Sequence, residues 1–198
     1  VTVLFACLIG SALLFYAGWE LIIVGLLCVL FAFLYTTGPY PLSYNGWGDV
    51  LVIVFFGFVP VGGTYYVQAL TWTSDTTVAS LICGLLIDTL LVVNNYRDRE
   101  ADARSGKRTV IVRFGEKFGR YLYLMLGVAA SLLCFWFFFE GHLFAALLPL
   151  LYLIPHVLTW RRMVQIHSGK KLNSILGETS RNMLLMGILL SIGFLIRH

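Results

Sequence analysis

The sequence predicts an all-α fold, a polytopic bundle of membrane-spanning helices, on the basis of three observations. The mean hydropathy of the chain is +0.86, and 59% of its 198 residues are hydrophobic. A soluble core cannot bury this much apolar surface in a chain of this length. Apolar runs of spanning length recur along the chain, and only 12% of the residues are charged. We therefore expect residues 1–198 to form a single transmembrane domain in a lipid bilayer.

About seven apolar runs are predicted to be spans. The first two are short, and the seventh carries polar side chains in its first turns. No basic segment precedes the first run and no small-residue cleavage site follows it, so no signal peptide is predicted. The predicted spans are Val1–Tyr16, Leu21–Tyr35, Val50–Val67, Thr77–Val93, Tyr121–Phe139, Leu143–Trp160 and Leu176–Ile196.

Lys and Arg residues gather in two of the predicted loops. Of the 14 in the chain, eight lie between Arg97 and Arg120 and five lie between Arg161 and Arg181. Because cytoplasmic loops of membrane proteins carry an excess of Lys and Arg, both loops are predicted to be cytoplasmic. The basic residues stand at the ends of membrane helices, so we expect anionic phosphate or lipid as a partner and no nucleic acid.

The remaining connections follow from that orientation. Counting back one helix at a time places the 36–49 loop on the cytoplasmic side as well. The connections at 18–20, 70–76 and 140–142 are short and contain no Lys or Arg. Three long loops are thus expected on one face and three tight turns on the other. Long polar loops on one side predict an active site that faces the cytoplasm.

The segment Asn94–Thr109, NNYRDREADARSGKRT, holds eight of the 24 charged side chains of the chain. Asp98 and Asp102 are four residues apart, so on a helix their carboxylates share one face, with Cβ atoms about 6 Å apart. Mg²⁺ is usually bound by one or two carboxylates together with substrate phosphates. We therefore predict that Asp98 and Asp102 are catalytic residues and Mg²⁺ ligands.

Cationic side chains flank these two carboxylates. Arg97 precedes them, and Lys107 and Arg108 follow. Guanidinium and ammonium groups bind phosphate oxygens, so the three are predicted to bind substrate. Carboxylates for a metal and cations for phosphate, at a membrane surface, indicate a lipid diphosphate. The alternative is that the D-x-x-x-D spacing arises by chance and that the loop is merely solvated and orients the chain.

Three more polar residues lie in the apolar run that leads into this segment. Asn94 and Asn95 end the run, where an amide is costly unless it is paired, and both are predicted to bind substrate. Asp88 lies deeper, within LICGLLIDTLLVVNN. An ionisable residue inside a span is a candidate catalytic residue. A structural pair with a polar group on a neighbouring helix is the equal alternative for Asp88.

Aromatic residues characterise the 36–49 loop and its start. The side chains of Tyr35, Tyr40 and Tyr44 are predicted to cap the substrate site, where aromatic faces stabilise a cation. The alternative is an interfacial aromatic belt, which is common in membrane proteins.

The third loop contributes Arg181 as a predicted substrate-binding residue on the same side of the membrane. The alternative is a purely structural pair between Glu178 and Arg181, which are three residues apart.

Proline positions predict irregular helices. Pro60 is expected to bend the third predicted span, and Pro149 and Pro155 the sixth. His156 follows Pro155 and is predicted to be a packed or hydrogen-bonded histidine and not a catalytic base.

The segment NNYRDREADARSGKRTVIVRFG, Asn94–Gly115, resembles the second aspartate-rich motif of the UbiA superfamily of intramembrane prenyltransferases. The form N-N-x-R-D-x-x-x-D-x-x-x-G-K-x-T-x-x-V-R-x-G is similar to the 1,4-dihydroxy-2-naphthoate polyprenyltransferase branch of menaquinone biosynthesis. Residues Tyr35–Gln68 resemble the next most distinctive region of that branch, and Leu176–Gly193 resembles its last helix.

The resemblance implies a bundle of an expected nine membrane helices around a central cavity, of which the seven spans here would match helices three to nine. It implies that Mg²⁺ bridges the carboxylates and a polyprenyl diphosphate. It also implies the reaction: the prenyl group passes to an aromatic acceptor, 1,4-dihydroxy-2-naphthoate, with loss of CO2 and diphosphate, giving demethylmenaquinol.

The first aspartate-rich motif of the family, between its second and third helices, is not found before Val1–Tyr16, and the chain does not begin with Met. We therefore expect the chain to be N-terminally truncated and, taken alone, inactive.

Two other functions stay open at the level of sequence. The first is another prenyltransferase of the superfamily, acting on a benzoate or other acceptor. The second is a polytopic transporter with Asp88 as a proton or ion site. Against transport, the strongest polarity lies in one cytoplasmic loop, and the hydropathy shows no inverted repeat. The prenyl chain length and the oligomeric state do not follow from the sequence.

Overall fold

The computed structural model describes residues 2–196, and helices make up nearly all of that part of the chain, with no strand in it. The predicted all-α fold is therefore confirmed. The helices, in order, are α1 Thr2–Ser11, α2 Leu14–Ala17, α3 Glu20–Thr36, η1 Leu42–Tyr44, α4 Gly48–Val52, η2 Ile53–Gly62, α5 Gly63–Ala69, α6 Ser74–Arg104, α7 Val110–Phe114, α8 Glu116–Leu133, α9 Trp136–Phe139, α10 Leu143–Leu147, η3 Leu148–Tyr152, α11 Leu153–Ile166, η4 Lys170–Leu172 and α12 Asn173–Leu195.

Each of the seven predicted apolar runs is largely helical within residues 2–196, and Val1, the predicted start of the first run, lies outside the described residues. Five continuous helical stretches are long and apolar enough to cross a membrane. The first two runs form the shorter apolar helices Thr2–Ala17 and Glu20–Thr36, as the short first two runs in the sequence predicted. The five long stretches are Gly48–Ala69, Ser74–Arg104, Glu116–Phe139, Leu143–Ile166 and Lys170–Leu195.

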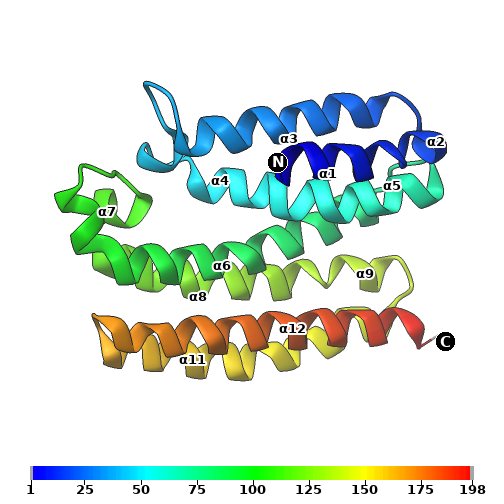
Figure 1. Cartoon of the computed structure of the whole chain (residues 1–198). Coiled ribbons are helices and arrows are strands. Elements are labelled where there is room, and N and C mark those ends of the chain that lie inside the picture. The colour runs from blue at the N-terminus through cyan, green and yellow to red at the C-terminus, as the bar shows by residue number, and fades with distance from the viewer. Residues whose placement is uncertain (1, 197–198) are drawn as a thin grey trace.

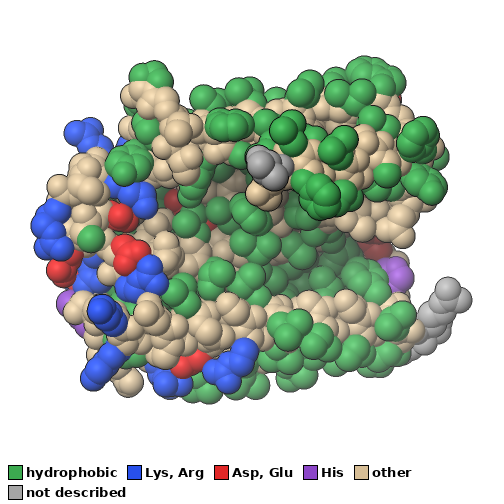
Figure 2. Space-filling view, in the orientation of Figure 1, with side chains coloured by type: hydrophobic (Ala, Val, Ile, Leu, Met, Phe, Trp, Pro, Cys, Tyr) green, Lys and Arg blue, Asp and Glu red, His purple; other side chains and the backbone are tan. Residues whose placement is uncertain are grey.

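The helices run side by side, and their connections separate into two kinds at opposite ends of the bundle (Figure 1). At one end lie the loop between α3 and α4, the segment around α7, and the turn between α11 and α12. The other end holds the tight turns after α2, α5 and α9. Lys and Arg side chains collect at the end with the long loops (Figure 2), so the predicted division of the connections is confirmed.

Two irregular helices occur where proline was expected to disturb the backbone. Pro60 lies within η2, a stretch of π-helix, and Pro149 lies in the first turn of η3, a 3₁₀-helix. Pro155 does not interrupt α11, because it stands in the first turn, where its missing N–H has no partner to lose.

Glycines allow η2 and α6 to approach closely. A Cβ atom on Gly57 would lie 2.5 Å from the carbonyl oxygen of Ser80, and one on Gly84 would lie 2.9 Å from that of Ile53. Only residues without a side chain fit at such a contact, as in other membrane helix pairs. The contact brings the beginning of α4 beside the middle of α6.

The packed core lies in the half of the bundle formed by α6 and the helices after it. One buried cluster, near the long loops, includes Tyr96, Tyr123 and Met163. A second, toward the tight turns, includes Phe137 and Tyr152. By contrast, no residue of α1 or α3 is buried.

His156 is fully buried between these clusters. It shares a hydrogen bond of 2.9 Å with the hydroxyl of Tyr152, and its other ring nitrogen lies 3.2 Å from the carbonyl oxygen of Leu124. Its ring stacks on Tyr123. The prediction that His156 is a hydrogen-bonded packing residue is confirmed.

Candidate active site

Helix α6 carries the central residues of the candidate site. Thr73 caps its beginning, because the Thr73 hydroxyl accepts a hydrogen bond of 3.2 Å from the backbone N–H of Thr76. The helix then continues for 31 residues, which at about 1.5 Å per residue exceeds a hydrocarbon core of roughly 30 Å. Its last turns therefore extend beyond the apolar layer. Asp98 and Asp102 lie in these turns, on one face, as predicted.

Both carboxylates pair with a cation from the same segment. The guanidinium of Arg97 donates to both oxygens of Asp98, over 2.8 Å from Nε and 2.6 Å from Nη2. The ammonium of Lys107 lies 3.4 Å from Oδ2 of Asp102. The side chain of Asp98 is 38% exposed and that of Asp102 is 14% exposed. We call these four residues the carboxylate clamp.

Arg97 also connects the clamp to other parts of the bundle. Its Nη2 donates to Oδ1 of Asn94 over 2.7 Å, and its Nη1 donates to Oδ1 of Asn173 over 2.9 Å. Asn173 is the first residue of α12. The two amide oxygens and Asp98 thus fix the guanidinium in place, and the third loop contributes Asn173 to the site.

The loops on either side of the clamp are joined through their backbones. The N–H of Arg108 donates to the carbonyl oxygen of Tyr44 over 2.7 Å, and the guanidinium of Arg113 donates to the carbonyl oxygen of Asn45 over 2.7 Å. Gly46 makes this approach possible, since it has a φ of +80° and a Cβ there would lie 3.0 Å from the carbonyl oxygen of Arg108. The 37–47 loop therefore lies against the loop that carries Lys107.

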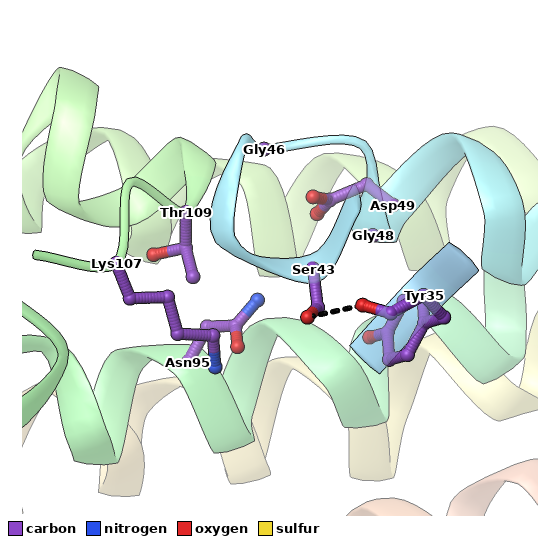
Figure 3. A pocket seen from close by; sticks show the side chains of 8 residues that line it. All are labelled: Tyr35, Ser43, Gly46, Gly48, Asp49, Asn95, Lys107 and Thr109. Atoms are coloured by element: carbon purple, nitrogen blue, oxygen red, sulfur yellow. Dashed lines mark hydrogen bonds between the residues drawn. The ribbon is translucent and has the colours of Figure 1, made fainter. Parts of the chain in front are cut away.

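A small pocket lies between these two loops and α6 (Figure 3). Lys107 and Thr109 line it from the loop after α6, and Asn95 lines it from α6 itself. Ser43 closes another side and donates a hydrogen bond of 2.6 Å to the carbonyl oxygen of Tyr35. The full lining consists of Tyr35, Ser43, Gly46, Gly48, Asp49, Asn95, Lys107 and Thr109.

Two carboxyl groups beside this pocket have oxygen atoms without a partner. Oδ1 of Asp49 and Oδ1 of Asp88 are buried and accept no hydrogen bond from any residue between 2 and 196. Asp88 is 1% exposed. The structure therefore provides no hydrogen-bonding partner for Oδ1 of Asp88 on a neighbouring helix, which was the structural alternative for this residue.

The structure brings most of the predicted site residues to one place. Tyr35, Asn95 and Lys107 line the pocket, and the clamp lies beside them at the end of α6. Three predicted residues are placed differently. Tyr40 and Tyr44 have side chains that are 59% and 43% exposed, and Tyr44 takes part through its carbonyl oxygen. The side chain of Arg108 is exposed, does not line the pocket and pairs with no residue in the described range.

Arg181 is not brought to this pocket, because it lines a separate cavity between α11 and α12. The alternative of a Glu178–Arg181 pair is wrong: Glu178 pairs with Arg162, over 2.6 Å.

Sequence reasoning did not select four residues that the structure places at the site: Ser43, Asp49, Thr109 and Asn173. Thr109 is part of the G-K-x-T pattern and caps α7 by accepting a hydrogen bond from the N–H of Val112. That pattern was a signal that could have identified Thr109. For Asp49, the signal was an acidic residue between a polar loop and an apolar run.

A complete protein metal site is not found within residues 2–196, since no three His, Cys, Asp or Glu side chains are grouped there to hold an ion. The two clamp carboxylates nevertheless fit Mg²⁺, because this ion takes oxygen ligands and is commonly held by two carboxylates and the phosphates of a substrate. The donors present therefore fit an ion that arrives with a diphosphate.

The chain is similar in sequence to known proteins. Residues 1–192 match the UbiA prenyltransferase family. The chain belongs to this family. The 1,4-dihydroxy-2-naphthoate octaprenyltransferase of Haemophilus influenzae is 38% identical over 181 residues, which is 87% of this chain and 56% of the relative. The enzyme of the same name from Escherichia coli is 39% identical over 140 residues, or 68% of this chain and 45% of the relative.

A mycobacterial relative gives a similar result. The Mycobacterium tuberculosis protein of the same name is 44% identical over 119 residues, covering 60% of this chain and 40% of the relative. The chain thus spans about half the length of the curated relatives that it matches. No solved structure matches the chain. Membership of the UbiA family, together with five helices of spanning length, makes it an integral membrane protein.

Proposed function

We propose that the protein transfers a polyprenyl group from polyprenyl diphosphate to 1,4-dihydroxy-2-naphthoate, with loss of CO2 and diphosphate, giving demethylmenaquinol. The observation that carries the proposal is the carboxylate clamp: two carboxylates and two cations beside a polar pocket, at the charged end of a membrane helix bundle. The names of the relatives support the choice of acceptor. By the positive-inside rule, this end of the bundle faces the cytoplasm.

Asp98 and Asp102 would hold Mg²⁺ together with the diphosphate. The ion, when bound, neutralises negative charge on the leaving group. Arg97, which pairs with Asp98, and Lys107, which pairs with Asp102, would then be available to bind the diphosphate. The guanidinium of Arg97 offers a planar pair of donors to phosphate oxygens, and Lys107 a point charge. Arg108, which follows Lys107 in the chain and is exposed, would add a third cation.

The reaction breaks the C–O bond between the prenyl group and the diphosphate, and the diphosphate leaves with the electron pair. The ring carbon of the naphthoate that bears the carboxylate then bonds to the allylic carbon. The electrons of the bond between the ring and its carboxylate return to the ring, and CO2 is released. Charge stabilisation at the leaving group lowers the barrier, and an aromatic face such as that of Tyr35 stabilises the allylic cation.

The buried carboxyls provide acceptors for the ring hydroxyl groups. Oδ1 of Asp49 and Oδ1 of Asp88 have no partner within the described chain, and a buried acceptor without a partner is costly. A hydroxyl group of the acceptor would satisfy them and would be held in one orientation. Asn95, which is buried and lines the pocket, can orient the same molecule through its amide.

The apolar prenyl chain requires an apolar path. Figure 2 shows a hollow in the face of the bundle, between the upper helices α1–α5 and the lower helix α12, with hydrophobic side chains on its walls. A chain that leaves the charged end can follow this hollow along the bundle and contact lipid. This supports a prenyl diphosphate over a small water-soluble diphosphate.

The test is product mass spectrometry on the natural full-length protein in membranes, offered several acceptors and several prenyl diphosphates. We expect a product with the mass of demethylmenaquinol only from 1,4-dihydroxy-2-naphthoate, and only with Mg²⁺ present. A product from a benzoate acceptor instead would identify a different prenyltransferase of the family. Transport of a solute, without metal-dependent binding of a prenyl diphosphate analogue, would overturn the proposal entirely.

A further inference from the structure

A second cavity lies between α11 and α12, separate from the pocket at the clamp, and has a volume of ≈ 600 Å³. Facing stripes of the two helices form it, with positions three or four residues apart on each. Its lining residues are Pro155, Leu158, Thr159, Arg161, Arg162 and Gln165 from α11, and Glu178, Arg181, Asn182 and Leu185 from α12.

A buried polar network forms the back of this cavity. The amide nitrogen Nδ2 of Asn182 donates a hydrogen bond of 2.9 Å to the hydroxyl of Thr159. That hydroxyl in turn donates a hydrogen bond of 3.4 Å to the carboxylate of Glu178. Arg162 completes the network through its pair with Glu178. Because Glu178 is already held by these partners, it is not a free acceptor for a cationic ligand.

Two arginines of the cavity have no such partner. The guanidiniums of Arg161 and Arg181 are exposed, and neither forms an ion pair or hydrogen bond with another residue between 2 and 196. With three arginines and one glutamate, the lining carries an excess of two positive charges. The ligand that fits this charge is an anion.

The cavity changes from charged to apolar along its length. On α11, Pro155 and Leu158 precede Arg161, so they lie farther from the charged end of the bundle. On α12, which runs in the opposite direction, Leu185 follows Arg181 and also lies farther from that end. Leu158 and Leu185 are 53% and 37% exposed. An anion attached to an apolar chain would fit both the charged and the apolar part of the cavity, whereas a free phosphate would fit only the charged part.

We propose that the α11–α12 cavity binds the headgroup of an anionic phospholipid of the bilayer, with Arg161 and Arg181 on its phosphate and the acyl chains along Pro155, Leu158 and Leu185. Basic pockets between membrane helices on the cytoplasmic side bind such headgroups in other proteins. The site is independent of the proposed prenyl transfer, because none of its residues belongs to the clamp or its pocket.

Native mass spectrometry of the natural full-length protein, titrated with phosphatidylglycerol or with phosphatidylcholine, tests this site. We expect preferential retention of phosphatidylglycerol. The double variant Arg161→Gln/Arg181→Gln should lower its affinity by roughly tenfold, since each cation near an anionic headgroup contributes to binding. The matched control, Lys170→Gln/Lys171→Gln, removes the same charge at the same end of the bundle without touching the cavity, and should change the affinity less than about twofold.

Three results would overturn the proposal. The first is equal retention of the two lipids, which is also expected where another helix of the protein fills the cavity. The second is an equal loss in the lysine control. The third is equally tight binding of sn-glycerol 3-phosphate, which would make the cavity a site for soluble anions.

A second variant predicts a gain and does not depend on removing arginines. Glu178→Gln removes the negative charge but keeps an oxygen for the Thr159 hydroxyl. Affinity for phosphatidylglycerol should therefore rise in the folded variant. An unchanged or lower affinity would contradict the proposed electrostatics.

Discussion

Carboxylates meet arginines or lysines at several places in the charged end of this bundle, and two of these places are built differently. In the carboxylate clamp, Asp98 and Asp102 pair with Arg97 and Lys107 from their own segment. In the α11–α12 cavity, Glu178 on one helix pairs with a partner on another and also accepts a hydrogen bond from a threonine. The side chain of Asp98 is 38% exposed, against 10% for Glu178.

The difference indicates which carboxylates can exchange partners. Exposed ion pairs contribute little to stability, so a ligand of higher charge replaces the cation that pairs with Asp98 at small cost. Asp102 is less exposed, but only the long 3.4 Å contact with Lys107 holds it. A carboxylate that is buried and held from a second helix stabilises the packing of that pair, and leaving it unpaired is expensive. We therefore assign chemistry to the clamp and structure to Glu178, and the following substitutions test this division.

Asp98→Asn should give the largest effect. The amide keeps the shape of the side chain but removes the charge that would hold Mg²⁺, so we expect kcat/KM for prenyl transfer to fall by roughly 10²- to 10³-fold. Turnover should be measured in the full-length protein across a Mg²⁺ titration. Unchanged turnover at saturating Mg²⁺ would exclude the metal role of Asp98.

Lys107→Gln should reduce activity by roughly 10- to 100-fold, mostly through KM for the diphosphate, because one charge-assisted contact to phosphate is lost. Lys117→Gln is the matched control, since Lys117 lies near the same end on α8, is exposed and does not line the pocket. Steady-state kinetics at varied diphosphate concentration gives kcat and KM for the Lys107→Gln and Lys117→Gln variants separately. Equal losses in both variants would mean that only the overall charge of this end matters.

Asp88→Asn should lower activity by about tenfold, because an amide is a weaker acceptor for a ring hydroxyl group than a carboxylate. Thermal stability should not fall, since Oδ1 of Asp88 has no hydrogen-bond partner within the described residues to lose. The control is Ser80→Ala on the same helix, whose buried hydroxyl also has no partner within the described residues. It should leave activity unchanged, and a matching loss there would remove the specific role of Asp88.

Arg162→Gln should show the smallest effect. We expect this substitution to lower the stability of the protein and not its rate of prenyl transfer. Glu178 then loses its cation, but Arg162 is 58% exposed and solvent compensates in part, so we expect a loss of about 1 kcal/mol in the free energy of unfolding. Thermal unfolding in detergent measures this. Adding Glu178→Gln should restore most of the loss, and a double variant no more stable than the single one would contradict the pair.

The sequence was sufficient for features that depend on local pattern. Apolar runs located the helices, and the charge of the loops separated the two ends of the bundle. The spacing of Asp98 and Asp102 placed them on one face, because i and i+4 neighbours are fixed by helix geometry alone.

Features that depend on which helices face each other were not predictable in this way. Asp49 and Asp88 are far apart in the chain and come to neighbouring helices because α4 packs on α6. Arg181 shares the charged end with the clamp, yet its side of α12 faces α11 and not α6. The sequence pattern of a single helix does not predict which other helix packs against each of its faces.

The close contact at Gly57 and Gly84 has one more consequence. Two backbones that touch cannot slide along each other, because the residues on either side carry a Cβ atom that would collide. Asp49 lies two to three turns from this contact along the continuous helix α4–η2, and Asp88 lies one turn from it along α6. The glycine pair therefore fixes the position of one carboxyl group relative to the other along the helix axes, although neither glycine lies at the site.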